Sequence, residues 1–163
     1  MPKTISMKKL IIISSLVIFV FACSNPDSNK GSEAGSTSSS TTANGNPSYD
    51  PERGEGKFKD VQVSETLDAA MAAQGEKASE LKCLSCHKLS DERLVGPGWQ
   101  GVTTRHKAEW LLNFMTNTDA MIDKDPKVQA MLEICMVRMP NQNLTDDEAR
   151  SIYEFMRKND GVK

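Results

Sequence analysis

Apolar residues recur at helical spacing in four stretches after residue 60, and no stretch there shows the two-residue alternation of a strand. Each stretch is bounded by polar residues, glycine or proline. The pattern predicts four helices, at residues 64–82, 107–116, 126–135 and 146–158. Because long loops separate them and no internal repeat is present, we expect a single all-α domain.

Polar and proline residues mark where these helices should begin. Ser64 is the expected N-cap of the first helix. Asp125 and Pro126 form a cap and first-turn pair for the third helix, and Thr145 with Glu148 forms a capping box for the last. The expected inward faces carry Leu67, Ala70, Met71 and Leu81 in the first helix, Trp110, Leu111 and Phe114 in the second, and Ala149, Ile152, Phe155 and Met156 in the last.

The N-terminus has the pattern of a targeting segment. Residues 10–22 form an almost unbroken apolar run behind Lys3, Lys8 and Lys9, which is the length of a signal-peptide core and short for a membrane span. The run ends in Val-Phe-Ala before Cys23, which resembles the lipobox of bacterial lipoproteins. We therefore predict a lipoprotein signal peptide at residues 1–22 and lipid attachment at Cys23. An ordinary signal peptide with an incidental cysteine is the alternative.

The next segment differs in composition from the helical part. Residues 24–46 are rich in Ser, Thr, Gly and Asn and nearly devoid of apolar side chains, so burial cannot offset their ordering entropy. We predict a flexible tether at residues 23–60, with Tyr49 and Phe58 docking only loosely, and a folded domain at 61–163. At ~5–6 Å × √n, a tether of about 37 residues reaches roughly 30–37 Å.

Composition and charge narrow the class of partner. Apolar residues make up 38% of the chain and aromatic residues only 6%, which is a lean core for 163 residues. The formal net charge is −2, with no strongly basic stretch. A basic footprint is the usual mark of nucleic-acid binding, so we expect no nucleic-acid partner.

The clearest chemical motif is Cys83-Leu84-Ser85-Cys86-His87, the attachment signature for a c-type haem. Two thiols at this spacing can form thioethers with the porphyrin vinyl groups, while the adjacent imidazole of His87 faces the iron. A thioredoxin-like dithiol is one alternative, but it expects a βαβ setting. A zinc site that adds Cys135 or His106 is another, although no second closely spaced ligand pair supports it.

With this motif in place, residues 64–160 resemble class I cytochrome c. Gly75 matches the glycine at which the first and last helices of that family cross closely. Gly96-Pro97 resembles the family's Gly-Pro, whose carbonyl accepts a hydrogen bond from the ligating histidine. Met139-Pro140 resembles the distal methionine loop. The resemblance implies a class I fold around one covalent haem c, with His87 and Met139 as axial ligands and Pro97 orienting His87.

Several assignments remain open at this level. Met121, Met131 and Met136 are alternative candidates for the sixth ligand. If Met139 does not match the family's distal methionine, the iron could be five-coordinate. Trp99 either donates its indole N–H to a haem propionate or only packs in the core. Arg105 either forms an ion pair with a propionate or is exposed to solvent. Cys135 is left over and is expected to be a small buried hydrophobe.

Two filled axial positions leave no place for a small-molecule substrate, so the expected function is an electron carrier and not an enzyme. A haem sensor or catalyst with an open sixth position, or a subunit of a larger complex, are the alternatives. The expected partners are a quinol-oxidising complex and a terminal reductase or oxidase, with the carrier lipid-anchored and facing the periplasm. The chain also resembles small Bacteroidetes-type cytochromes that accompany nitrous oxide reductase, which implies a denitrification enzyme as acceptor.

Overall fold

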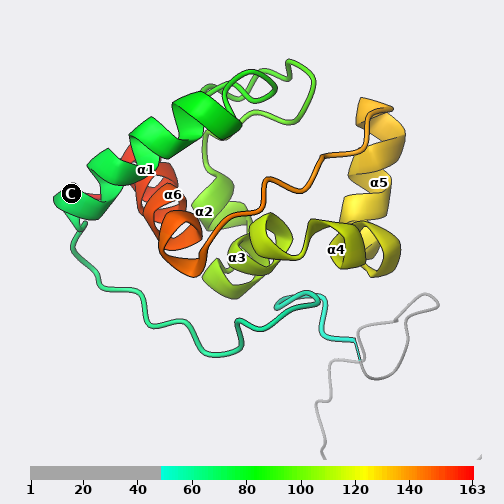
Figure 1. The fold of residues 1–163 in the computed structure, drawn as a ribbon, viewed down its shortest axis with the longest axis horizontal. Coiled ribbons are helices and arrows are strands. Elements are labelled where there is room, and N and C mark those ends of the chain that lie inside the picture. Colours follow the sequence, from blue (N-terminus) through cyan, green and yellow to red (C-terminus); the bar gives the residue numbers. More distant parts are fainter. Residues whose placement is uncertain (1–48) are drawn as a thin grey trace, which may run out of the picture. The chain divides into compact units, whose positions relative to one another are not determined.

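Helices and connecting loops make up the part of the chain that this computed structural model describes, residues 49–163, and this part contains no strand. The predicted signal peptide, Cys23 and most of the predicted tether lie outside the described residues. No described helix combines the length and apolar content needed to cross a bilayer. Figure 1 shows the six helices, α1 (Ala69–Lys82), α2 (Val102–Arg105), α3 (Ala108–Thr116), α4 (Thr118–Lys124), α5 (Pro126–Cys135) and α6 (Asp146–Asn159).

The crossing of α1 and α6 is the most extensive contact between the described helices and joins the first helix of the domain to the last (Figure 1). The buried face of α1 consists of the small residues Ala72, Gly75 and Ser79. A Cβ atom on Gly75 would collide with the backbone carbonyl of Ser151 in α6. The close packing expected at Gly75 is therefore confirmed, because only glycine lets the two backbones approach so closely.

The predicted start of the first helix is wrong. The helix begins at Ala69, and its N-cap is Asp68, whose side chain accepts a hydrogen bond from the Met71 amide. The Ser64 carbonyl instead accepts a hydrogen bond from the Arg157 guanidinium in α6, and the Leu67 amide donates to the Lys163 carbonyl at 3.0 Å. These tertiary bonds hold the segment before Asp68 out of the helix.

The predicted inward face of this helix also needs correction. Ala70 is exposed, and the Leu81 side chain is 86% exposed at the mouth of a cleft. The apolar periodicity favoured the stripe with Met71 and Leu81, whereas α6 packs against the side of α1 that carries Ala72, Gly75 and Ser79.

The other three predicted helices are confirmed. The second begins at Ala108, the third runs from Pro126 to Cys135 behind the Asp125 cap, and the last has the capping box between Thr145 and Glu148. The short helices α2 and α4 were not predicted, because four and seven residues are too few to produce a periodic apolar pattern.

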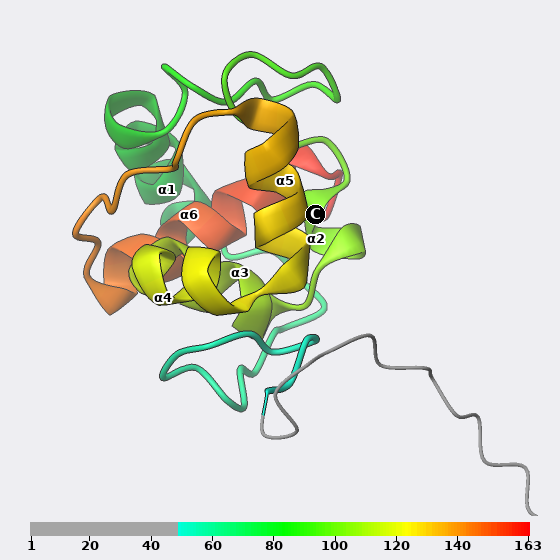
Figure 2. The ribbon, with the colours of Figure 1, turned by 90° about the vertical axis from the view of Figure 1, so that its right-hand side faces the viewer.

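Residues 49–60, here called the strap, pack against α3 and α4 instead of docking loosely (Figure 2). The fully buried Asn113 accepts a hydrogen bond from the Phe58 amide at 2.9 Å and donates to the carbonyls of Arg53 and Phe58 at 3.0 and 2.9 Å. The Glu55 amide donates to the Met121 sulfur at 3.0 Å. The packed domain thus already includes Tyr49, twelve residues before the expected boundary at Val61.

Candidate functional site

The predicted attachment motif lies where α1 ends. Cys83 is the C-cap of α1, and its carbonyl accepts hydrogen bonds from the amides of Cys86 and His87, each at 3.0 Å. This tight turn places Cys83, Cys86 and His87 along the wall of one cleft. No disulfide joins the two thiols, and burial raises the pKa of the Cys83 thiol to about 11. Both sulfurs therefore remain available for covalent attachment.

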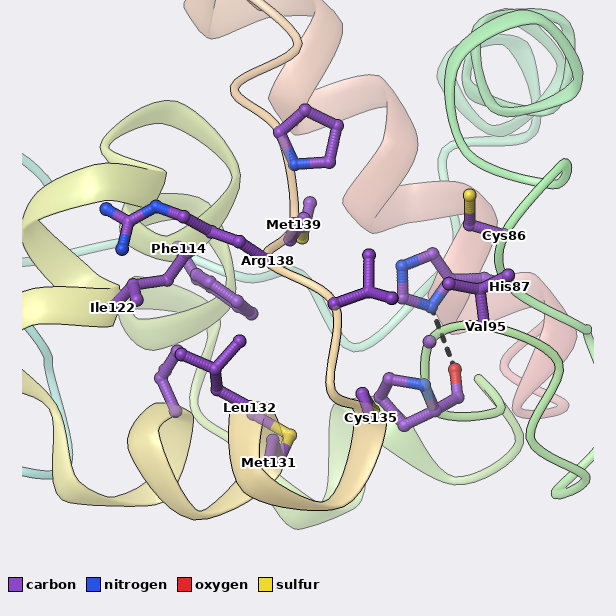
Figure 3. A pocket seen from close by; sticks show the side chains of 15 residues that line it. Cys86, His87, Val95, Phe114, Ile122, Met131, Leu132, Cys135, Arg138 and Met139 are labelled. Atoms are coloured by element: carbon purple, nitrogen blue, oxygen red, sulfur yellow. Dashed lines mark hydrogen bonds between the residues drawn. The ribbon is translucent and has the colours of Figure 1, made fainter.

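The His87 imidazole is held from behind. Its Nδ1 lies 2.8 Å from the Pro97 carbonyl, the contact drawn as a dashed line in Figure 3. A carbonyl can only accept, so Nδ1 carries the proton and Nε2 is left with a free lone pair. Burial lowers the pKa of His87, although the Pro97 hydrogen bond opposes that shift. The neutral imidazole is the form that coordinates a metal, and the predicted role of Pro97 matches this geometry.

A short loop carries this carbonyl back to the histidine. The amides of Val95 and Gly96 donate to the Cys86 carbonyl at 3.1 and 2.9 Å. A Cβ atom on Gly96 would collide with the His87 ring. Sequence reasoning matched Gly96-Pro97 to a family pattern, but the steric reason for the glycine appears only in three dimensions.

Across from His87, the segment 136–140 carries Met139, and both residues line the same two adjoining hollows, here called the crevice (Figure 3). The first hollow is almost entirely apolar, and the second encloses about 310 Å³. Sequence reasoning did not assign most of the apolar lining, because its members come from loops and three helices. They include Val95, Phe114, Ile122, Val128, Leu132 and Val137.

The structure distinguishes the four methionines that were candidates for the sixth ligand. Met121 is fully buried, and its sulfur accepts a hydrogen bond from the strap. Met136 is 86% exposed at the C-cap of α5 and is absent from the crevice lining. Met131 lines the crevice together with Met139. Of the four methionines considered from the sequence, Met131 and Met139 share the crevice with His87, and Met139 lies on the segment after α5.

Trp99 and Arg105 both line the second hollow, as the expectation of haem-contacting roles requires. The Trp99 ring is buried, with its centroid 5.6 Å from that of His87 and 6.5 Å from that of Phe155. The exposed Arg105 guanidinium bonds to the carbonyls of Gln100 and Gly98, the latter at 3.1 Å. Trp99 therefore combines core packing with a position in the cleft wall.

Two remaining cysteine and histidine assignments can be compared with the geometry. Cys135 is only half-buried and lines the crevice, so it is not the fully buried hydrophobe expected. The His106 ring stacks on Trp110 at 4.0 Å, and burial lowers its pKa. Within residues 49–163 no group of three or more His, Cys, Asp or Glu side chains could hold a metal ion. The zinc alternative has no support in this part of the chain.

The residues present fit a covalent haem. The site offers two unpaired thiols at the attachment spacing, a neutral imidazole with a free Nε2, and facing thioether sulfurs. An apolar crevice with soft and imidazole donors suits the porphyrin and its iron. A helical fold with this motif at the end of its first helix defines the class of c-type haem proteins.

A family model described as Cytochrome c matches residues 72–160, and the chain belongs to the cytochrome c family. Among solved structures, cytochrome c from Rhodothermus marinus is 34% identical, with a TM-score of 0.62 over 64% of this chain and 90% of its own. An engineered form, Rma TDE, is 33% identical, with a TM-score of 0.64 over 68% of this chain and 98% of its own. No curated protein sequence matches.

Family membership establishes the fold class and the cofactor. The fold is that of class I cytochrome c, with six helices in the described part where the sequence predicted about four. The cofactor is covalent haem c bound through the CxxCH motif, which this chain carries at residues 83–87. The chain is thus a haem protein of a family of electron carriers.

Proposed function

We propose that the chain is a membrane-tethered monohaem cytochrome that passes single electrons between respiratory partners. In this proposal Cys83 and Cys86 form the thioethers, and His87 and Met139 are the two axial ligands. The observation that carries the proposal is that His87 and Met139 line the same crevice from different loops. With both axial positions filled, no position is left for a substrate.

Bound haem c supplies a one-electron iron couple. The chain's own residues set its surroundings. Pro97 fixes the ring orientation of His87 through the Nδ1 hydrogen bond, which also makes Nε2 a better donor. The neutral thioether of Met139 favours the reduced state and raises the potential. The apolar crevice wall excludes water and lowers the local dielectric.

The proposed tether gives the carrier its location. A lipid on Cys23 and a flexible segment before the strap would hold the domain near the periplasmic face of a membrane. Tethering raises the effective concentration of the carrier for partners in the same membrane. The proposed partners are a quinol-oxidising complex and a terminal reductase or oxidase. The resemblance to cytochromes that accompany nitrous oxide reductase favours a denitrification reductase as acceptor.

The test is the absorption spectrum of the full chain, produced in a bacterium with haem-maturation machinery. We expect covalent low-spin haem in the membrane fraction, with the weak far-red sulfur-to-iron band in the oxidised protein. The Met139→Ala variant should lose this band, and its potential should fall because a neutral sulfur ligand no longer favours ferrous iron. Met136→Ala is the matched control, since Met136 is 86% exposed and lies outside the crevice lining, and it should keep the band.

Three results would count against parts of the proposal. A band that survives in Met139→Ala but disappears in Met131→Ala assigns the sixth ligand to Met131. High-spin wild-type haem favours the alternative function, a sensor or catalyst with an open position. Haem found only in the soluble fraction would show that the protein is not tethered to a membrane.

An engineered cytochrome c from Rhodothermus marinus has been solved bound to a carbene intermediate.

A further inference from the structure

The histidine side of the crevice is joined to α5 by a single hydrogen bond. Arg93 lies in the loop between His87 and Pro97, and its Nη1 donates to the Ile134 carbonyl at 2.5 Å. Among the described residues, no other hydrogen bond connects residues 88–98 with α5. A cleft lined by Arg93, Pro97, Ile134 and Cys135 lies where the two walls meet.

The loop that carries Arg93 is fixed to the haem-binding segment. Its far end is tied to Cys86 by the amides of Val95 and Gly96, and the Trp99 amide donates to the Lys88 carbonyl at 2.9 Å. These backbone bonds make the loop a firm base for the Arg93 side chain, because backbone pairs do not depend on long flexible side chains.

The C-terminal half of α5 contains no fully buried residue, and only Met131 and Leu132 at its start pack, partly buried, against the core. The only buried residue of the helix is Val128, in its first turn. Near the other end, Ile134 is 63% exposed and Met136 is 86% exposed. Among the described helices, α5 makes an extensive contact only with α4. The position of the end of α5 therefore depends on few protein contacts.

Arg93 meets α5 where a cation is favoured. Ile134 is the second-last residue of α5, so no amide within the helix donates a hydrogen bond to its carbonyl. The helix dipole adds negative charge at this end, and a guanidinium there makes a charge-assisted hydrogen bond. Met139 follows Cys135 by four positions, so the end of α5 sets where the Met139 segment begins.

We propose that Arg93 is a positioning residue that clasps the histidine-side loop to the end of α5 and thereby keeps the Met139 segment closed over the crevice. The proposal rests on the proposed function, because it takes Met139 as the sixth ligand. The clasp should resist displacement of Met139 by small external ligands, since displacement requires the 136–140 segment to move away from the crevice.

The test measures the affinity of the oxidised holoprotein for imidazole, followed through loss of the far-red band. Arg93→Met removes every N–H donor while keeping an unbranched side chain. It should bind imidazole about three- to tenfold more tightly, the range expected for losing one exposed charge-assisted hydrogen bond. Lys77→Met is the matched control, because Lys77 is an exposed residue of α1 that forms no ion pair within the described part, and its imidazole affinity should not change. Arg93→Gln keeps N–H donors without the charge, so its imidazole affinity should lie between those of wild type and Arg93→Met.

The outcomes separate the clasp from the proposed function. Wild type with the far-red band and an imidazole affinity that Arg93→Met leaves unchanged overturns the clasp alone. A wild-type protein without the band overturns both proposals. A lower unfolding midpoint without tighter imidazole binding shows a merely structural role for Arg93, and this also overturns the clasp. Tighter binding in Arg93→Met, with Lys77→Met unchanged, supports it.

Discussion

On the histidine side of the crevice the wall is held by backbone groups, whereas on the methionine side it is held by side chains. The Cys83 and Cys86 carbonyls each accept two amide hydrogen bonds, and the Pro97 carbonyl accepts a hydrogen bond from Nδ1 of the His87 ring. Behind this wall, α1 and α6 cross at Gly75 with almost no intervening side chain. The histidine side is therefore built from contacts that most substitutions leave intact.

The methionine side depends on a buried carboxylate and a few ion pairs. Asp125 is fully buried and accepts hydrogen bonds from Trp110 Nε1 at 2.8 Å, from the amides of Lys127 and Val128 at 2.7 and 3.0 Å, and from the Tyr49 hydroxyl. Beyond α5, Arg138 pairs with Asp119 and Asp123 on α4, at 3.1 and 3.3 Å.

The contrast shows which half of the crevice is adjustable. Solvent-exposed ion pairs such as those of Arg138 are screened by water and salt, so they contribute little to stability. Side chains can also be replaced one at a time without changing the path of the backbone. If His87 and Met139 are the axial ligands as proposed, substitutions on the methionine side should alter ligation there while the covalent haem attachment and the His87 side are preserved.

The largest effect is expected at the crossing of α1 and α6, which lies behind the histidine side of the crevice. Gly75→Val places a branched side chain against the backbone of Ser151, which cannot move without separating α1 from α6. We expect a loss of about 3 kcal/mol or more in the free energy of unfolding, with both sides of the crevice lost together. Urea unfolding of the holoprotein measures this change.

Ala73→Val is the control for helix propensity, since Ala73 is an exposed residue of the same helix. It should cost only about 0.5 kcal/mol. Equal losses for the two variants would show that the close crossing at Gly75 does not determine stability.

A smaller and one-sided effect is expected at Asp125. Asp125→Ala removes the N-cap of α5 and leaves the buried Trp110 N–H without its partner. We expect a loss of about 2–4 kcal/mol, from the cap and the unsatisfied donor together. The thioether-bound haem and His87 ligation should remain, whereas the far-red methionine band should weaken as α5 loosens.

Asp60→Ala is the matched control, because Asp60 is exposed and forms no ion pair within the described part. If Asp125→Ala loses His87 ligation together with the methionine band, the two sides are not independent, and the comparison fails.

Features encoded by neighbouring residues could be predicted from the sequence. The attachment motif, the Asp125 cap and the Thr145 capping box each place side chain and backbone partner within a few residues. Gly75 could be predicted because an isolated glycine in a helix has a cost that close packing explains.

Features that depend on distant partners could not be predicted. Ser64 and Asp68 are both good caps, and the choice of Asp68 follows from bonds that the preceding segment makes with Arg157 and Lys163. The strap has few apolar residues, and it docks through the amide of Asn113, which hydropathy does not register. The lining of the first hollow of the crevice likewise combines α3, α4, α5 and two loops.

The smallest effect is expected where the strap meets the methionine side. Burial, with the hydrogen bond to Asp125, raises the pKa of the Tyr49 phenol above its ordinary 10.0. The unfolded chain therefore releases this proton at lower pH than the folded protein, so stability is lost as pH rises above about 10. Tyr49→Phe should cost about 1 kcal/mol near neutral pH, for one hydrogen bond. Its unfolding free energy should then fall less steeply than that of wild type as the pH rises above about 10. Since both proteins share all other titrating groups, the difference between their urea unfolding curves isolates Tyr49. Parallel pH profiles would show that the strap does not hold the phenol against Asp125, and that the methionine side depends on the remaining three hydrogen bonds of that carboxylate.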